Sequence, residues 1–241
     1  MRFSAFAGRN GKELLRDPMS LVLMVGLPLI LLFVLSAMNN KVPADVFGIA
    51  SLAPGIAVFG LAFIALFSGT LIANDRGSSF LARLHASPLS SFDFIMGYTL
   101  PLMYIAVAQS LFCFVAAFFL GLPVNMNVAL ALLALLPVAV LFVGFGLLLG
   151  TLFSPEQVGG IGSILVVATT LLGGTWFDLS MIGGTFETVA NALPFAHAVD
   201  ATRAAINGDV SSMFPNLLWC IAYAAFVFLI AVFTFKQKMS R

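Results

Sequence analysis

Residues 46–74 read VFGIASLAPGIAVFGLAFIALFSGTLIAN, and this stretch contains no Asp, Glu, Lys, Arg or His. A helix needs about 20 mainly apolar residues to cross a bilayer. A charged side chain near the bilayer centre costs several kcal/mol, so a long interval without charges is typical of a membrane span. The stretch is therefore predicted to cross a membrane as a helix.

The same criterion, applied outward from residues 46–74, divides the rest of the chain. The composition is 61% hydrophobic and 9% charged, whereas a soluble domain has about 25% charged residues, which excludes a soluble protein. The apolar runs show no alternation, so helices rather than a closed barrel are expected. The sequence predicts an all-α integral membrane protein with six transmembrane helices, at 19–38, 54–74, 95–120, 128–152, 158–177 and 217–235.

The positions of Lys and Arg predict the orientation, because basic flanks are retained in the cytoplasm. Nine of the 11 basic residues fall on one side when the N-terminus is placed inside, and only Lys41 and Arg203 fall on the other. We expect a multi-pass protein of the cell membrane with both termini cytoplasmic. The formal net charge of +1 gives no electrostatic attraction for nucleic acid, which is not expected as a partner.

Residues 1–17 are predicted to form a cytoplasmic interfacial amphipathic helix, ahead of a six-span domain at 18–241. Asp17-Pro18 ends this helix and begins the first span, and Asn10-Gly11 weakens it. An ordinary positive flank that only fixes the topology is the alternative. The helical pattern places Arg2, Arg9, Lys12 and Arg16 on one arc and Phe3, Ala7 and Leu14 on another.

The cytoplasmic segment 75–91 is predicted to contain a short helix between the second and third spans. Ser78 can cap its start, and Ser87-Pro88 ends it. Phe80, Leu81 and Leu84 form an apolar side. This side has no core of its own to cover it.

The outer segment 178–216 has too many charges to cross the membrane, so we expect a re-entrant helical segment over the outer exit. Pro194 is predicted to break it into two short helices. In the second of these, one face should pack toward the spans and the other should face water. The inner face holds Phe195, Val199 and Ile206, and the outer face holds His197, Asp200 and Arg203.

The chain contains no catalytic motif of the kinds that hydrolases and metalloenzymes use, and it has only two histidines. It also lacks a P-loop. We therefore expect no enzymatic activity and no cofactor in this chain. The middles of the six predicted spans have no ionisable residue, which disfavours a carrier driven by protons or sodium.

Two motifs give the chain a resemblance to a known family. The first is Asp75-Arg76-Gly77, followed by Leu84 and by Ser87-Pro88-Leu89. The second is the outer run from Leu193-Pro194-Phe195 through Asp200-Ala201-Thr202-Arg203 to Gly208. In their order and spacing these motifs resemble the membrane subunits of ABC-2 type exporters, which have the type V exporter fold. The resemblance covers essentially the whole chain, which is also similar to drug and antibiotic export permeases.

The resemblance implies a permease subunit of an ATP-driven exporter that moves an apolar or amphipathic substrate out of the cytoplasm or inner leaflet. The implied partners are a cytoplasmic P-loop ATPase subunit, which would hold ATP and Mg, a second copy or paralogue of the permease, and membrane lipid. The family's coupling helix maps onto Ser78 to Ala86, with Ser78, Phe80, Leu81, Arg83 and Leu84 as the contact residues. Its substrate path maps onto Phe59, Phe63 and Phe67 in the second span and Thr169 and Thr170 in the fifth.

Several alternatives stay open at this point. The three phenylalanines recur at i, i+4 and i+8, and such a stripe also suits simple packing against neighbouring helices. A self-contained secondary carrier, a membrane scaffold protein and an exporter of a lipid-linked glycan are the other functions to weigh. The permease could form a homodimer or a heterodimer.

Overall fold

The computed structural model describes residues 2–39, 48–77 and 91–239. The described part of the chain is helical and contains no β-strand. Its elements are α1 (Arg2–Arg16), α2 (Pro18–Leu21), the π-helical turn η1 (Val22–Gly26), α3 (Leu27–Asn39), α4 (Ile49–Gly77), α6 (Ser91–Phe119), α7 (Met126–Leu152), α8 (Pro155–Leu172), the 3-10 turn η2 (Leu179–Met181), α9 (Gly184–Asn191), α10 (Pro194–Ile206) and α11 (Val210–Met239).

Six of these segments are long and apolar enough to span a membrane, which confirms the predicted number of spans. The first span is composite: α2, η1 and α3 follow one another without a break, and the Asp17 carboxylate caps α2 by accepting a hydrogen bond from the Ser20 amide. The predicted start at Asp17-Pro18 is therefore correct, with Pro18 in the first turn.

Three predicted boundaries were wrong by five residues or more. The second span begins at Ile49 rather than at residue 54. The fifth span ends at Leu172 rather than at residue 177, because Gly173 ends the helix and Gly174 adopts a left-handed φ of 58° that favours glycine. The sixth helix begins at Val210 rather than at residue 217. Its polar first turns are stabilised by Asp209, whose carboxylate accepts hydrogen bonds from the Ser211 hydroxyl and the Ser212 amide.

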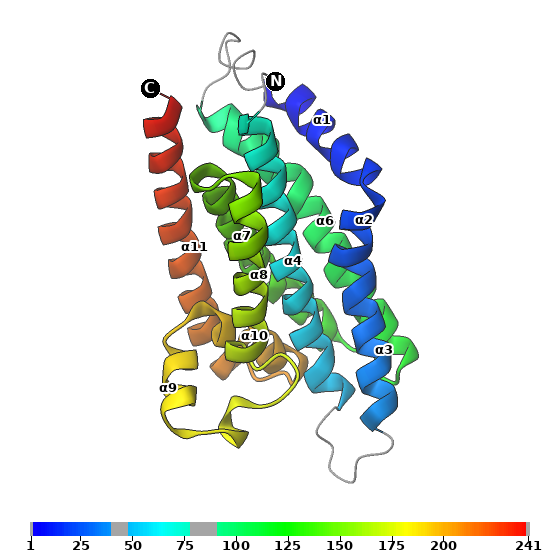
Figure 1. Cartoon of the computed structure of the whole chain (residues 1–241). Coiled ribbons are helices and arrows are strands. Elements are labelled where there is room, and N and C mark those ends of the chain that lie inside the picture. Colours follow the sequence, from blue (N-terminus) through cyan, green and yellow to red (C-terminus); the bar gives the residue numbers. More distant parts are fainter. Residues whose placement is uncertain (1, 40–47, 78–90, 240–241) are drawn as a thin grey trace.

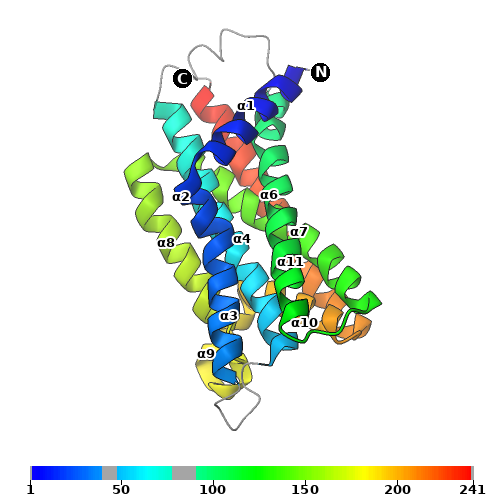
Figure 2. The ribbon, with the colours of Figure 1, turned by 90° about the vertical axis from the view of Figure 1, so that its right-hand side faces the viewer.

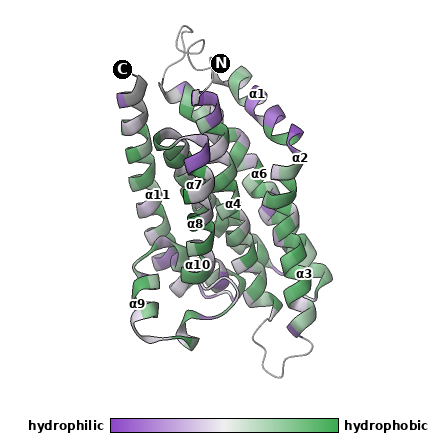
Figure 3. Cartoon of the chain, in the orientation of Figure 1, coloured by the Kyte–Doolittle hydropathy of each residue, from purple (hydrophilic) through white to green (hydrophobic). Residues whose placement is uncertain are grey.

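The helix α4 lies at the centre of the bundle and packs against α3, α6, α7, α8 and α10 (Figure 1). Both termini and the connection between α7 and α8 lie at one end of the bundle, and α9 and α10 lie at the other. Hydrophobic residues cover most of the length of the spans, whereas hydrophilic residues gather toward the two ends (Figure 3). The polar and charged side chains are therefore found mainly at the two ends of the bundle.

The helix α1 crosses the end of the bundle and packs against α6 (Figure 2). Its buried side is formed by Phe6, Asn10 and Leu14, which recur every four residues. The Asn10 side chain donates a hydrogen bond to the Gly97 carbonyl at 3.0 Å, so Asn10-Gly11 does not weaken the helix as predicted. Gly97 also makes room for the Phe6 ring, since a Cβ there would lie 2.1 Å from Cδ1 of Phe6.

Candidate coupling junction and substrate path

An ion pair joins α1 to the end of α4 at the end of the bundle where the termini lie. The Arg9 guanidinium donates two hydrogen bonds to the Asp75 carboxylate, 2.7 Å from Nη1 to Oδ2 and 3.1 Å from Nη2 to Oδ1. The Tyr98 hydroxyl of α6 donates to the same Oδ2 at 2.6 Å. Arg9, Asp75 and Tyr98 thus connect three helices, and we call this group the coupling junction.

Burial makes the coupling junction sensitive to the loss of any member. The side chain of Asp75 is only 6% exposed, and Tyr98 is completely buried. Burial lowers the pKa of Arg9, but the hydrogen bond to Asp75 and its charge outweigh that effect and raise the pKa above its usual value. Glu13 forms a second ion pair with Arg9 at 2.7 Å, and partial burial raises the pKa of Glu13 against the opposing effect of Arg9.

The next residue, Arg76, connects α4 to a fourth helix. Its guanidinium donates hydrogen bonds to the carbonyls of Gly150, at 2.6 Å, and Thr151. These carbonyls belong to the last turn of α7, where backbone acceptors have no partner within the helix. Asp75 and Arg76 therefore fasten α4 to α1, α6 and α7 just before the chain continues into residues 78–90.

The sequence-predicted coupling residues Ser78, Phe80, Leu81, Arg83 and Leu84 lie outside the described residues. Sequence reasoning missed the coupling junction, because it placed Arg9 with the other basic residues on one arc of an interfacial helix and assigned it no partner. Two signals pointed to it. Asp75 ends a long uncharged interval and so needs a cation nearby, and Asn10 falls in line with Phe6 and Leu14 at helical spacing.

The aromatic residues of α4 form one continuous column. The ring centroids of Phe59 and Phe63 are 5.1 Å apart, and those of Phe63 and Phe67 are 6.4 Å apart. Trp176, from the loop after α8, extends the column with a centroid 6.0 Å from that of Phe59. Phe59 is 5% exposed and Phe63 and Phe67 are half-buried, so only the latter two offer a surface without rearrangement of the chain.

The two threonines of the predicted path are buried on α8. The hydroxyl of Thr169 donates to the Leu165 carbonyl and that of Thr170 to the Val166 carbonyl, both at 2.8 Å. These hydroxyls are satisfied within their own helix, as is usual for threonine in apolar helices. Sequence reasoning did not identify Trp176, because it lies in the loop that was predicted to be the end of a span.

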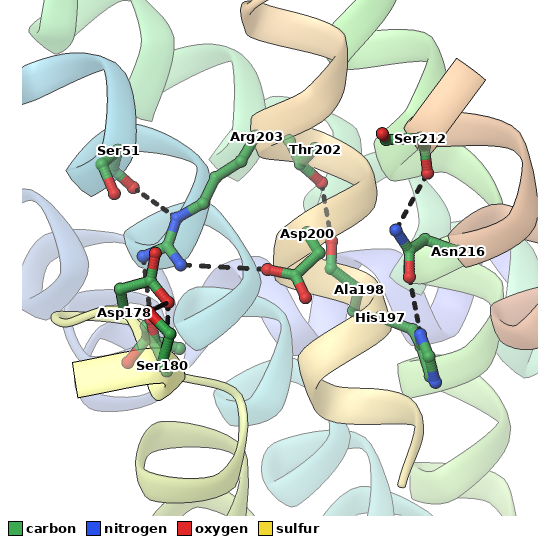
Figure 4. A network of polar contacts seen from close by, with 12 residues as sticks. Ser51, Asp178, Ser180, His197, Ala198, Asp200, Thr202, Arg203, Ser212 and Asn216 are labelled. Atoms are coloured by element: carbon green, nitrogen blue, oxygen red, sulfur yellow. Dashed lines mark hydrogen bonds and ion pairs between the residues drawn. The ribbon is translucent and has the colours of Figure 1, made fainter. Parts of the chain in front are cut away.

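At the opposite end of the bundle, Arg203 of α10 points inward, which corrects the prediction that it faces water (Figure 4). Its Nε donates to the Ser51 carbonyl at 3.2 Å, and its Nη2 donates to the Gly174 carbonyl at 2.8 Å. The side chain is only 14% exposed. Arg203 therefore holds α10 against the start of α4 and the loop after α8.

Charged groups around Arg203 have shifted pKa values. Burial lowers the pKa of Arg203 itself, and burial raises that of Asp200, which lies 4.0 Å away. The Ser180 amide and hydroxyl donate to Asp178 and lower the pKa of that carboxyl. Phe195, Val199 and Ile206 are buried as predicted. The placement of residues 178–216 relative to a membrane stays a prediction.

The side chain of His197 is held in place by contacts with two other helices. Its Nδ1 lies 2.6 Å from the Asn216 amide oxygen, its Nε2 lies 2.9 Å from the Asn191 carbonyl, and its ring stacks on Trp219. These contacts connect α10, α9 and α11. Within the described ranges, no group of three or more His, Cys, Asp or Glu residues is placed to hold a metal ion.

Comparison with protein families gives a match between residues 1–207 and the model of the ABC-2 type transporter family. A comparison with curated proteins gave no match. The matched region includes the coupling junction, the aromatic column and α10. It covers most of the chain and includes the first five of the six apolar helices. The chain therefore belongs to the ABC-2 type transporter family.

Proposed function

We propose that this chain is the membrane subunit of an ATP-driven exporter that moves an apolar or amphipathic substrate out of the cytoplasm or the inner leaflet. The family implies an ABC ATPase partner in general. In this proposal the ATPase is a separate cytoplasmic subunit that binds ATP and Mg, and two permease subunits stand side by side.

The observation that carries the proposal is the connection of Asp75 and Arg76 to three other helices. Residues 78–90 follow directly and are expected to contact the ATPase. A displacement of these residues would act on α1, α6 and α7 together, since buried ion pairs and packed helices move as units. Such an arrangement suits a protein that receives mechanical work at its cytoplasmic end.

The aromatic column supports the class of substrate. Apolar walls with a few polar groups favour ligands of the same character. The indole Nε1 of Trp176 is buried and has no hydrogen-bond partner among the described residues. An unpaired buried donor costs about 1–3 kcal/mol, so a substrate that offers an acceptor would gain affinity there. This favours an amphipathic molecule over a pure hydrocarbon.

Partner coupling is tested by the double substitution Leu81→Asp and Leu84→Asp. The charges should prevent an apolar contact with the ATPase, so substrate-stimulated ATP hydrolysis by the purified complex should fall by at least about tenfold, which is 1.4 kcal/mol. Membrane insertion, followed by the amount of protein in washed membranes, should not change. Undiminished stimulation would contradict the coupling assignment, and a permease that transports without any ATPase would favour a secondary carrier.

The substrate path is tested by Phe63→Ala and Trp176→Phe. Phe63→Ala removes half-exposed aromatic surface and should change the relative transport of a panel of amphipathic compounds several-fold, with little effect on basal ATP hydrolysis. Trp176→Phe keeps an aromatic ring but removes the indole N–H, so it should lower the transport of compounds that carry a hydrogen-bond acceptor. Phe226→Ala, at an exposed position of α11, is the matched control. If all three variants transported the compounds in the same relative amounts, the predicted substrate path would be refuted.

Orientation is tested by single cysteines in a chain that lacks Cys113 and Cys220. The two substitutions are Thr185→Cys and Glu156→Cys. Thr185 lies on α9 and Glu156 lies at the start of α8, and both are exposed, at opposite ends of the bundle. An impermeant maleimide should label position 185 in intact cells and position 156 only after the membrane is opened. The reverse pattern would overturn the predicted topology.

A further inference from the structure

An open groove with a cavity volume of about 710 Å³ lies between α1 and α6. This volume is within the range of about 300–1,000 Å³ that is common for small-molecule sites. The groove lies outside the coupling junction and the aromatic column. Its apolar lining comes from Ala7, Gly8 and Gly11 of α1 and from Pro101, Ile105 and Ala108 of α6.

The groove exists because one side of α1 carries small residues. A Cβ added at Gly8 would meet no atom within 4 Å, so the space beside this residue is empty. At Gly11 the nearest atom to such a Cβ is Cβ of Pro101, at 3.5 Å, so the two helices are in contact there. The helices therefore touch at Gly11 and leave room beside Gly8.

The lining of the groove includes the polar side chains of Ser4 and Lys12, and Lys12 gives it a positive charge. Lys12 is an exposed lining residue, and it forms no ion pair with any residue that the structure describes. No acidic residue lines the groove. The large side chains beside it, Leu15 and Tyr104, are 65% and 75% exposed. An apolar groove with a single unpaired ammonium group matches a ligand that has a hydrocarbon chain and an anionic head.

We propose that this groove binds an anionic phospholipid of the inner leaflet, with its phosphate at Lys12 and an acyl chain along Gly8, Pro101 and Ala108. The groove is open, and its α6 side belongs to the candidate span Asp93–Phe119, so lipid is the medium expected around it. Basic groups near a membrane surface attract anionic lipids. A second copy of the chain suits the groove less well, since an isologous contact would bring Lys12 toward Lys12 with no acid to separate them.

The bound lipid would contact both α1 and α6 beside the packed residues Phe6 and Asn10. It would therefore stabilise the docked position of α1. This role is independent of the substrate that the permease exports and of its ATPase partner.

The experiment uses the full chain purified in detergent and then incubated with dioleoyl phosphatidylglycerol or with dioleoyl phosphatidylcholine. Native mass spectrometry counts the lipids retained, and thermal unfolding measures the stabilisation. We expect retention of phosphatidylglycerol over phosphatidylcholine and a higher Tm with the former. Gly8→Leu should fill the groove and lower retention of both lipids, whereas Gly8→Ala adds one methyl group and should leave retention close to that of the unaltered chain.

The contribution of the Lys12 charge to lipid binding is tested separately. Lys12→Gln should lower the retention of phosphatidylglycerol about fivefold and remove the preference over phosphatidylcholine, because one basic residue near the surface contributes about that factor. Arg16→Gln removes the same charge from an exposed position of α1 that does not line the groove, and it should have a smaller effect.

Three results would overturn the proposal. The first is unchanged retention in Gly8→Leu, which would place the lipid elsewhere. The second is an equal loss in Lys12→Gln and Arg16→Gln, which would indicate a diffuse surface charge. The third is a lower fraction of dimer in Gly8→Leu with unchanged lipid retention, which would make the groove an interface between two copies of this chain.

Discussion

Replacing Arg9 with Gln is expected to release α1 from the bundle. The substitution leaves the Asp75 carboxylate, which is 6% exposed, without the cation that donates two hydrogen bonds to it. Removing one partner of a buried ion pair costs 3–5 kcal/mol, and we expect about 3 kcal/mol because Arg9 itself is 36% exposed. Thermal unfolding of the full chain and hydrogen exchange of α1 measure the effect.

Companion variants separate the ion pair from a general disturbance of α1. The double variant Arg9→Gln with Asp75→Asn removes both charges and should recover part of the lost stability, since the two sites are coupled. Arg9→Lys should be intermediate, because an ammonium group cannot replace both guanidinium hydrogen bonds. Arg16→Gln is the matched control. Additive losses in the double variant would show that the pair contributes nothing specific.

Arg9→Gln also tests whether the coupling junction transmits conformational changes between the ATPase and the spans. In the complex with the ATPase, Arg9→Gln should lower substrate-stimulated ATP hydrolysis by about tenfold, which is 1.4 kcal/mol. Basal hydrolysis should persist, because the proposed function places the nucleotide in the other subunit. If stimulation remained complete while α1 exchanged rapidly, the coupling junction would serve stability alone.

Replacing Arg203 with Ala is expected to loosen the end of the bundle that holds α9 and α10. The carbonyls of Ser51 and Gly174 would lose the donor that holds them 3.2 and 2.8 Å from its nitrogens. Hydrogen bonds to a charged group contribute about 1.5–3 kcal/mol each, so a loss of about 3 kcal/mol is expected after relaxation. Limited proteolysis of residues 173–193 and the Tm of the full chain measure it.

Asp200→Asn is the contrasting variant at the same site. Its carboxylate lies 4.0 Å from Arg203 and is 45% exposed, so its loss should change stability by less than about 1 kcal/mol. Arg203→Lys should fall between the two, because one ammonium group reaches one carbonyl more easily than two. An Asp200→Asn effect as large as that of Arg203→Ala would show that the ion pair, and not the backbone contacts, holds α10.

The number of spans was predictable because the cost of burying a charge acts on every span alike. The ends of the spans were harder, since they depend on local backbone preferences. Trp176 is apolar and lengthened the fifth uncharged interval, but Gly173 and Gly174 end the helix before it. Conversely, Ser211 and Ser212 are polar and still belong to α11, because Asp209 stabilises its first turn.

The contacts of individual charges were not predictable from periodicity. A helical projection places a residue on a face but does not show which chain segment lies opposite that face. Arg9 was therefore given no partner, although Asp75 lies 66 positions away, and Arg203 was predicted to face water, although its acceptors are backbone carbonyls. Backbone acceptors carry no sequence signal. The three phenylalanines of the aromatic column were visible in the sequence, because their spacing lies within one helix.

The composition of the coupling junction has a consequence for how the protein is made. Arg9 is translated early, but Asp75 follows 66 residues later and Tyr98 another 23 residues after that. The α1 segment cannot reach its final position until the second span is in the bilayer and the third has begun to enter it. During synthesis it must wait at the membrane surface with its apolar side uncovered. The α1 segment therefore completes its folding only after segments that are translated later have been inserted.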